Sequence, residues 1–267
     1  MKLFISADIE GVSGIVDWTE TNKNHSDYRA FQLQMTNEVK AAAEGALKSG
    51  AKEILIKDAH ATARNIIHEL LPKETELING WYDHPYGMME GLDESFDGVL
   101  FIGYHCGAGF NGNPLAHTIS SSKIRYIKLN DELASEFKLN YYTALSLGVP
   151  VIFVSGDSDL IKDVNSTNPN IKGLAVKEGI GAGAKHLHPV LVEEKIKSIV
   201  ENTIKDYNKQ LFLGELPKEF KVEICYNRHT DAYKASFYPN VKLKDNNTIE
   251  FTCSDYFEAL RMKLFLI

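Results

Sequence analysis

Short apolar runs alternate with stretches of helical periodicity along the first two thirds of the chain. Between residues 28 and 49 the apolar positions recur every three or four residues, which predicts a helix, and Gly50 is typical of a helix end. Further helices are predicted over residues 64–71, from Asn130 or Asp131 to Leu147, and from Pro189 to about residue 210. Apolar runs of strand length occupy residues 2–7, 53–58, 98–105, 123–129 and 150–157.

The predicted strands in this alternation are almost continuously apolar, which is typical of strands buried on both faces of a sheet. Alternating strands and helices predict an α/β fold, with a three-layer α/β/α arrangement around a mostly parallel sheet. After residue 212 the pattern changes to shorter alternating strands at 221–227 and 248–254, followed by a last helix. We therefore expect an α/β domain carrying the functional site over residues 1–212, and a smaller C-terminal α+β subdomain over residues 213–267.

Composition and charge exclude several classes of protein. Of the 267 residues, 44% are hydrophobic and 24% charged, which is ordinary for a globular protein, and a net charge of −7 argues against nucleic acid as a partner. No apolar run approaches the roughly 18 residues needed to cross a membrane, and Asp8 and Glu10 interrupt any signal peptide. Three widely spaced cysteines without a CxxC pattern predict neither disulfides nor a thiolate metal site. We expect a cytoplasmic protein that binds neither nucleic acid nor membranes.

The first predicted strand ends in two carboxylates, Asp8 and Glu10, with one residue between them. Side chains two apart on a strand share a face, so these two converge. Like charges held this close raise each other's pKa unless a cation lies between them. A turn is the alternative explanation, because acidic residues often end strands and Gly11 and Gly14 follow.

Two further strands end in residues that can bind metals. The second predicted strand ends in Asp58 and is followed by His60, and the strong apolar strand after it ends in His105. The carboxyl ends of parallel strands line the ligand crevice of an α/β sheet, so we expect these side chains at one rim with the carboxylate pair. A lone histidine at such a rim is more often structural, but carboxylates and two imidazoles together are typical ligands of zinc. The pattern favours a divalent metal site.

One more histidine, His117, lies among small residues in the long loop after the strand that ends in His105. The glycine-rich stretch from Gly107 to Gly112 would let this loop fold back over the rim. Imidazole has an unperturbed pKa of about 6.5, which suits proton transfer at physiological pH. His117 is therefore a candidate for the chemistry at the metal site.

Several short motifs occur in the order and spacing of a known family. They are SADIEGVSG, KDAHAT, FIGYHCGAG, LAHTIS and PVIFVSGD, and with similar stretches they cover most of residues 1–180. On these motifs the chain resembles the D-aminopeptidase family of zinc peptidases, of the DppA type. The resemblance implies two zinc ions per chain and makes His117 the catalytic residue, described in that family as the nucleophile. The metal ligands that it implies are Asp8 as the bridge, Glu10, His60, His105 and Glu136.

The expected arrangement of these residues follows from their chemistry. Asp8 suits the bridging position, because a carboxylate can give one oxygen to each of two ions. Glu136 is implied by the resemblance alone, since by itself it looks like ordinary solvated charge on a helix. Asp58 is expected behind the ligands, where it would hold its strand end or accept an imidazole N–H. The two ions are expected to be completed by Glu10 with His105 and by His60 with Glu136.

The resemblance also implies a function and an assembly. The function is that of a zinc-dependent aminopeptidase that removes the N-terminal residue, a D-amino acid such as D-Ala, from short peptides or amides. The assembly is a ring-like homo-oligomer, a decamer, with its active sites inside a channel. Ala116 and Thr118 flank His117 where serine is expected on both sides, and this departure concerns the substrate pocket.

Two other classes of protein remain open on the residues alone. A dinuclear metallophosphoesterase is suggested by the DxH pattern at residues 58–60 and by the GDSD stretch at residues 156–159. Against it, the second motif has its spacing off by one, and no Asn-His-Glu sequence follows. A non-catalytic α/β protein with a structural metal would carry the same ligands without using His117.

Overall fold

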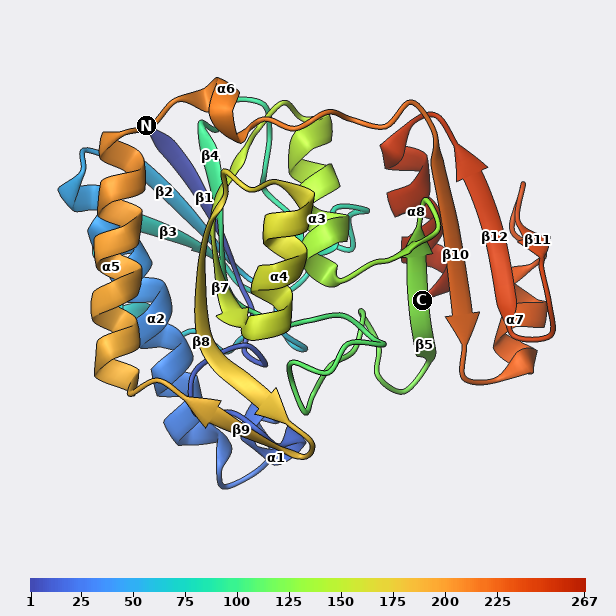
Figure 1. The fold of residues 1–267 in the computed structure, drawn as a ribbon, viewed down its shortest axis with the longest axis horizontal. Coiled ribbons are helices and arrows are strands. Elements are labelled where there is room, and N and C mark those ends of the chain that lie inside the picture. The colour runs from blue at the N-terminus through green and yellow to red at the C-terminus, as the bar shows by residue number, and fades with distance from the viewer.

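The computed structural model describes residues 1–267, and its larger β-sheet has seven strands (Figure 1). They are β1 (Lys2–Ala7), β2 (Glu53–Asp58), β3 (Thr75–Ile78), β4 (Gly98–Tyr104), β7 (Val151–Asp157), β8 (Lys172–Ile180) and β9 (Gly183–His186). Their order across the sheet is β3-β2-β1-β4-β7-β8-β9. All neighbours pair in parallel except β9, which is antiparallel to β8.

Helices cover both faces of this main sheet (Figure 1). α2 (Tyr28–Lys48) and α5 (Pro189–Lys205) lie together on one face. α3 (Glu136–Ser146) and α4 (Ser158–Thr167) cover the other face. The predicted α/β class with a mostly parallel sheet is therefore confirmed. The shorter helices are α1 (Trp18–Thr21), η1 (His68–Leu70), η2 (Gly87–Met89) and α6 (Lys209–Phe212).

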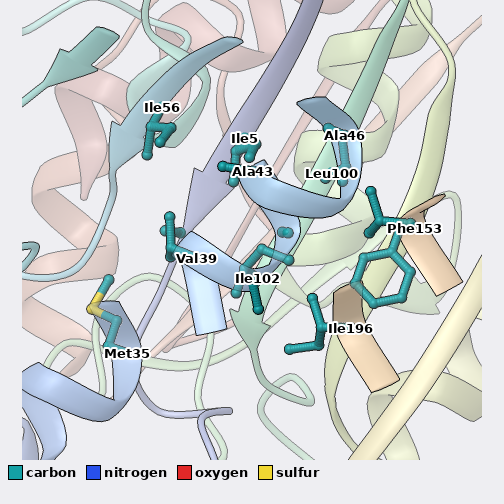
Figure 2. Close-up of a cluster of buried hydrophobic side chains, with 14 of the residues drawn as sticks. Ile5, Met35, Val39, Ala43, Ala46, Ile56, Leu100, Ile102, Phe153 and Ile196 are labelled. Atoms are coloured by element: carbon teal, nitrogen blue, oxygen red, sulfur yellow. The ribbon is translucent and has the colours of Figure 1, made fainter. Parts of the chain in front are cut away.

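The core between the main sheet and the layer of α2 and α5 is built mainly from aliphatic side chains, together with Phe153 of β7 (Figure 2). Ile5 of β1 and Ile102 of β4 are fully buried, as is Val39 of α2. The two helices approach each other closely at Gly45, where a Cβ atom would lie 2.5 Å from the carbonyl oxygen of Lys197. Each buried aliphatic side chain contributes roughly 1.5–3 kcal/mol, so this packing fixes the strands whose ends carry the site. No helix combines the length and the apolar character that a membrane span requires.

The second sheet is antiparallel and lies beyond α3 (Figure 1). Its five strands are, in spatial order, β11 (Lys242–Leu243), β12 (Thr248–Cys253), β10 (Phe220–Tyr226), β5 (Ile124–Leu129) and β6 (Glu132–Leu133). Two helices accompany it, α7 (His229–Ala235) and α8 (Tyr256–Leu266). The division of the chain at residue 212 stays a prediction, and β5 and β6 come from before that boundary.

The expectation that residues 123–129 form a strand of the main, mostly parallel sheet is wrong. This segment forms β5, which pairs antiparallel with β10. Along β5 the buried Ile124 and Ile127 are separated by the exposed Arg125 and the half-buried Tyr126. Such a mixture of buried and solvated positions is typical of an antiparallel sheet covered on one face.

The predicted helix over residues 64–71 is also wrong, because only the single turn η1 forms there. The carboxylate of Asp58 accepts the backbone N–H groups of Asn65 and Ile66, which holds this stretch as a loop. A side chain that binds backbone N–H groups in this way competes with helix formation.

The helix that was predicted to start at Asn130 or Asp131 begins later. α3 starts at Glu136, and the side chain of Ser135 accepts a hydrogen bond from the backbone N–H of Lys138 as the N-cap. Asn130 and Asp131 instead have positive φ angles of 51° and 70° in the turn between β5 and β6. Asparagine and aspartate tolerate this left-handed conformation better than most residues.

Candidate metal centre

All six site residues singled out in the sequence meet at the carboxyl edge of the main sheet. β1 lies between β2 and β4, so the residues that follow these three strands are neighbours. His117 comes from the loop between β4 and β5, and Glu136 is the first residue of α3. The strand ends supply Asp8 and Glu10 after β1, His60 after β2 and His105 after β4.

The possible ligand atoms form two groups of three, with the atoms of each group within 4.8 Å of one another. The first group is Asp8, Glu10 and His60, and the second is His105, His117 and Glu136. Asp8 connects the groups through its two oxygens. Its Oδ1 lies 3.3 Å from Nδ1 of His60, and its Oδ2 lies 3.5 Å from Nε2 of His105.

Each of the three histidines binds a backbone carbonyl through one ring nitrogen. Because a carbonyl oxygen only accepts, that nitrogen carries a proton, and in the neutral ring the other nitrogen has a free lone pair. This second nitrogen faces a carboxylate of the cluster in every case. Metal-binding histidines are typically fixed in this way. The pairs are His60 Nε2 with Thr21 O at 3.0 Å, His105 Nδ1 with Cys106 O at 2.9 Å, and His117 Nδ1 with Leu115 O at 2.9 Å.

The buried charges of this cluster fit a divalent cation. Burial, and then the neighbouring Glu10, raise the pKa of Asp8 to about 8. Burial would lower the pKa of His105, but Glu136 and the other carboxylates outweigh it and raise this pKa to about 9. Glu10 Oε2 and His105 Nε2 are buried without a hydrogen bond, although Glu10 Oε2 lies 2.9 Å from His60 Nδ1. Buried carboxylate and imidazole atoms that lack a hydrogen bond are a typical donor set for zinc.

Glu136 is held by the start of α3 and by the loop that carries His117. As the first residue of a helix its carboxylate is stabilised by the helix dipole. Its Oε1 accepts the backbone N–H of Ile119 at 2.7 Å. Ile119 has φ +66°, a left-handed conformation that is strained for a β-branched residue. The loop is thus bent sharply just after His117.

Asp58 supports His60 through the chain after β2, not through the imidazole ring. Its carboxylate accepts the side-chain amide of Asn65 at 2.8 Å, in addition to the two backbone N–H groups already described. The Asn65 amide also donates to the carbonyl of His60 at 2.7 Å. Of the two expectations for Asp58, it holds the strand end, whereas the imidazole N–H of His60 goes to Thr21.

A buried lysine, which no sequence pattern indicates, holds the loop that carries Glu10. Burial lowers the pKa of Lys177, in β8, to about 8. Its ammonium donates to the carbonyl oxygens of Glu10 at 2.5 Å, Val12 at 3.3 Å and Ile15 at 2.8 Å. The Asn113 amide donates to the same Glu10 carbonyl at 2.9 Å. These contacts fix the loop that presents the carboxylates, and because they all end on backbone carbonyls, no residue pattern reveals them.

An open cleft of about 570 Å³ lies above the cluster, a volume within the usual range of ligand pockets. His60 and His117 line this cleft, whereas His105 does not. The ring of His117 stacks on that of His105, with centroids 4.4 Å apart. His117 therefore separates His105 from the space that a substrate would occupy.

Comparisons with known proteins agree with this geometry. A sequence profile of the D-aminopeptidases matches residues 1–265. The chain belongs to the D-aminopeptidase family. The D-aminopeptidase of Bacillus subtilis is 34% identical over 270 residues, which are 99% of this chain and 96% of that protein.

A solved structure has the same fold over the full chain. It is the Zn-dependent D-aminopeptidase DppA from Bacillus subtilis, described as a self-compartmentalizing protease. The TM-score is 0.92 at 31% identity, and the match covers 100% of this chain and 96% of that one. The resemblance inferred from the motifs is confirmed, and with it the enzyme class of a metallo-aminopeptidase.

Within this D-aminopeptidase fold, the contacts among the candidate ligands differ from the expected pairing. Glu10 was expected with His105, but its Oε2 lies nearest to His60. Glu136 was expected with His60, but its Oε1 lies 3.7 Å from Nε2 of His105. The order of the strands fixes which residues meet, whereas the direction of each side chain across the rim depends on contacts that only the structure reveals.

Proposed function

We propose that this protein is a zinc-dependent aminopeptidase that hydrolyses the N-terminal residue, a D-amino acid such as D-Ala, of short peptides or amides. The observation that carries the proposal is the pair of ligand groups linked by the two oxygens of Asp8 on the floor of an open cleft. The related Bacillus subtilis protein is described as a Zn-dependent D-aminopeptidase, which supports both the metal and the substrate.

We propose that two zinc ions are held per chain. A catalytic zinc site uses three protein ligands and keeps one position open, so the five ligand candidates are too many for one ion. Zinc bound there would polarise a substrate carbonyl and lower the pKa of a water molecule. The residues that would hold the two ions are Asp8 as the shared ligand, Glu10 with His60, and His105 with Glu136.

His117 is the proposed catalytic residue. Its Nδ1–H donates to the Leu115 carbonyl, so its Nε2 has a free lone pair. This Nε2 lies in the cleft near Glu136, where it could accept a proton or attack the substrate carbonyl. The carboxylates that line the cleft are Asp8, Glu10 and Glu136.

We propose that the protein assembles into a ring-like homo-oligomer, a decamer. A cytoplasmic location and the absence of nucleic-acid partners stay predictions. The DppA protein is described as self-compartmentalizing, which supports an assembly of several copies. The C-terminal end of α8 carries Phe265, which is 69% exposed and suits a subunit contact. Light scattering at micromolar concentration should give a mass several times 29.9 kDa. A monomer would rule out the assembly and leave the zinc site untouched.

One assay separates the candidate functions. Zinc-loaded protein is offered D- and L-alanine p-nitroanilide beside p-nitrophenyl phosphate. We expect hydrolysis of the D-anilide, at least 10-fold slower hydrolysis of the L-anilide, and none of the phosphate ester, because a 10-fold preference requires only about 1.4 kcal/mol. Hydrolysis of the phosphate ester alone would favour the metallophosphoesterase, and no turnover of any compound would favour a non-catalytic metal-binding protein.

A further inference from the structure

Both tryptophans of the chain line the cleft above the metal centre. The sequence contains two, and they come from separate segments: Trp18 begins α1, and Trp81 lies in the loop after β3. Tryptophan is highly buried on average, yet these side chains are 42% and 37% exposed. Exposed tryptophans gathered at one concave surface are characteristic of binding hot spots.

The ring of Trp81 is held rigidly at the cleft. Its Nε1 donates to the carbonyl of Ala61, one residue after His60, at 2.8 Å. The ammonium of Lys57 lies 4.2 Å from the ring centroid, in a cation–π contact, and is itself paired with the buried Glu90 at 3.2 Å. One face of the ring is therefore covered, and the exposed remainder lines the cleft.

The ring of Trp18 is held beside the proposed catalytic residue. It makes an edge contact with His117, with ring centroids 5.3 Å apart. The short helix α1 that carries it is fixed by a capping box between Asp17 and Glu20. The same helix ends in Thr21, whose carbonyl accepts the imidazole N–H of His60. Trp18 is thus placed beside His117 and close to the metal centre.

The rest of the cleft offers little other apolar surface. Apart from the metal-site residues, its wall contains mainly amides, hydroxyl groups and one rim lysine, Lys23. Met88, Ile119 and two alanines are the remaining apolar residues. An apolar or aromatic side chain of a bound peptide would therefore gain most by packing on the indole rings, since aromatic pairs attract beyond the burial of their area.

We propose that Trp18 and Trp81 form an aromatic subsite that binds an apolar or aromatic side chain flanking the scissile bond. The inference rests on the proposed peptidase function and adds a substrate class to it: short peptides with a hydrophobic residue at that position. Trp18 and Trp81 are then the residues that determine specificity, with Lys57 and the Ala61 carbonyl as the groups that position Trp81.

The kinetic test compares side chains in two substrate series, in whichever stereoisomer the enzyme cleaves. One series is X-amide and the other is Ala-X, with X as alanine, serine, leucine or phenylalanine. In at least one series we expect kcat/KM for phenylalanine to exceed that for alanine by about 10-fold, the usual discrimination of an apolar pocket. Trp18→Ala and Trp81→Ala should each bring this ratio towards one, and Trp18→Phe and Trp81→Phe should retain most of it.

The ratio separates recognition from a structural effect, because a loosened active site would lower kcat/KM for both substrates alike. Phe237→Ala is the matched control, since Phe237 is an aromatic residue 72% exposed and outside the cleft. This control should leave the ratio and the zinc content unchanged. An unaltered ratio in both alanine variants would overturn the proposal.

A binding test does not depend on turnover. Both tryptophans lie in the cleft, so the emission of the metal-free protein reports this site alone when tryptophan is excited selectively, without the 12 tyrosines. Phenylalaninamide should protect the emission from acrylamide quenching, and alaninamide should do so only at concentrations about 10-fold higher. The single-tryptophan variants Trp18→Phe and Trp81→Phe assign the effect to each ring. Equal protection by both amides would refute the subsite, whereas protection without any peptidase activity would refute only the proposed function.

Discussion

The imidazole ring of His117 stacks on that of His105, with centroids 4.4 Å apart and planes inclined by 12°. Both rings donate Nδ1–H to a backbone carbonyl, and both direct Nε2 to the same oxygen of Glu136 at 3.7 Å. They differ in access, because the side chain of His105 is 1% exposed and that of His117 is 13% exposed and lines the cleft. The stack therefore contains an inner ring suited to hold a metal and an outer ring suited to meet a substrate.

Alanine variants of the two rings should separate these roles. His105→Ala should lose zinc and activity together. His117→Ala should keep its zinc and its fold while kcat falls by roughly 10²-fold to 10⁴-fold, the range for removal of a positioned proton-transfer group. Elemental analysis of each variant, measured beside its kinetics, checks both statements. Loss of zinc from His117→Ala would make this residue a ligand, and a kcat near wild type would remove it from the chemistry.

The left-handed backbone at Ile119 predicts that the glycine variant at this position is more stable than the alanine variant, the reverse of the usual order. Glycine normally lowers stability relative to alanine by roughly 0.4–1 kcal/mol, because it leaves the unfolded chain more conformational freedom, but at φ +66° alanine should be strained by roughly 1–2 kcal/mol. Ile119→Gly should therefore unfold at higher urea concentration than Ile119→Ala. At the exposed neighbour Ser121, which has no positive φ, the order should be reversed. The same order at both positions would contradict the bent loop after His117.

Glu38 in α2 predicts a pH dependence of the unfolding free energy. Burial raises its pKa from 4.5 to about 7, against the hydrogen bonds from Ser13 and Gln34. Between these two pKa values the folded protein keeps a proton that the unfolded chain has released. The contribution of Glu38 to the free energy of unfolding is therefore complete below pH 4.5 and is lost as the pH rises through about 7. The loss is about 3 kcal/mol at most.

Urea unfolding of metal-free wild type and Glu38→Gln between pH 5 and 8 measures this effect. The variant cannot titrate at this position, so its stability relative to wild type should rise with pH across the window. Parallel curves would show that Glu38 is not held as a buried acid. Metal-free protein is used because zinc release at low pH would otherwise dominate the comparison.

The strand-end residues of the site could be derived from the sequence, because one rule of α/β sheets brings the ends of parallel strands together. Asp8, His60 and His105 follow neighbouring strands, and the topology confirms that these ends meet. Glu136 required the family resemblance, since the sequence pattern starts its helix too early and hides the residue in the middle of a charged stretch.

Other contacts have no signature in the sequence. Lys177 binds only backbone carbonyls, and a lysine within a strand looks like any solvated residue. Trp18 and Trp81 are distant in the sequence, and they line the same cleft only because tertiary packing brings helix α1 and the loop after β3 there. The strand β5 was assigned to the wrong sheet because six residues of mixed polarity do not specify a partner.

Titration of zinc into chelator-treated protein tests the central claim most directly. We expect hydrolysis of D-alanine p-nitroanilide to be absent without metal and to rise to a plateau at two equivalents of zinc per chain. Asp8→Ala removes the ligand that links the two groups, and it should abolish that plateau. Full activity at one equivalent, or activity that persists without metal, would contradict the dinuclear site.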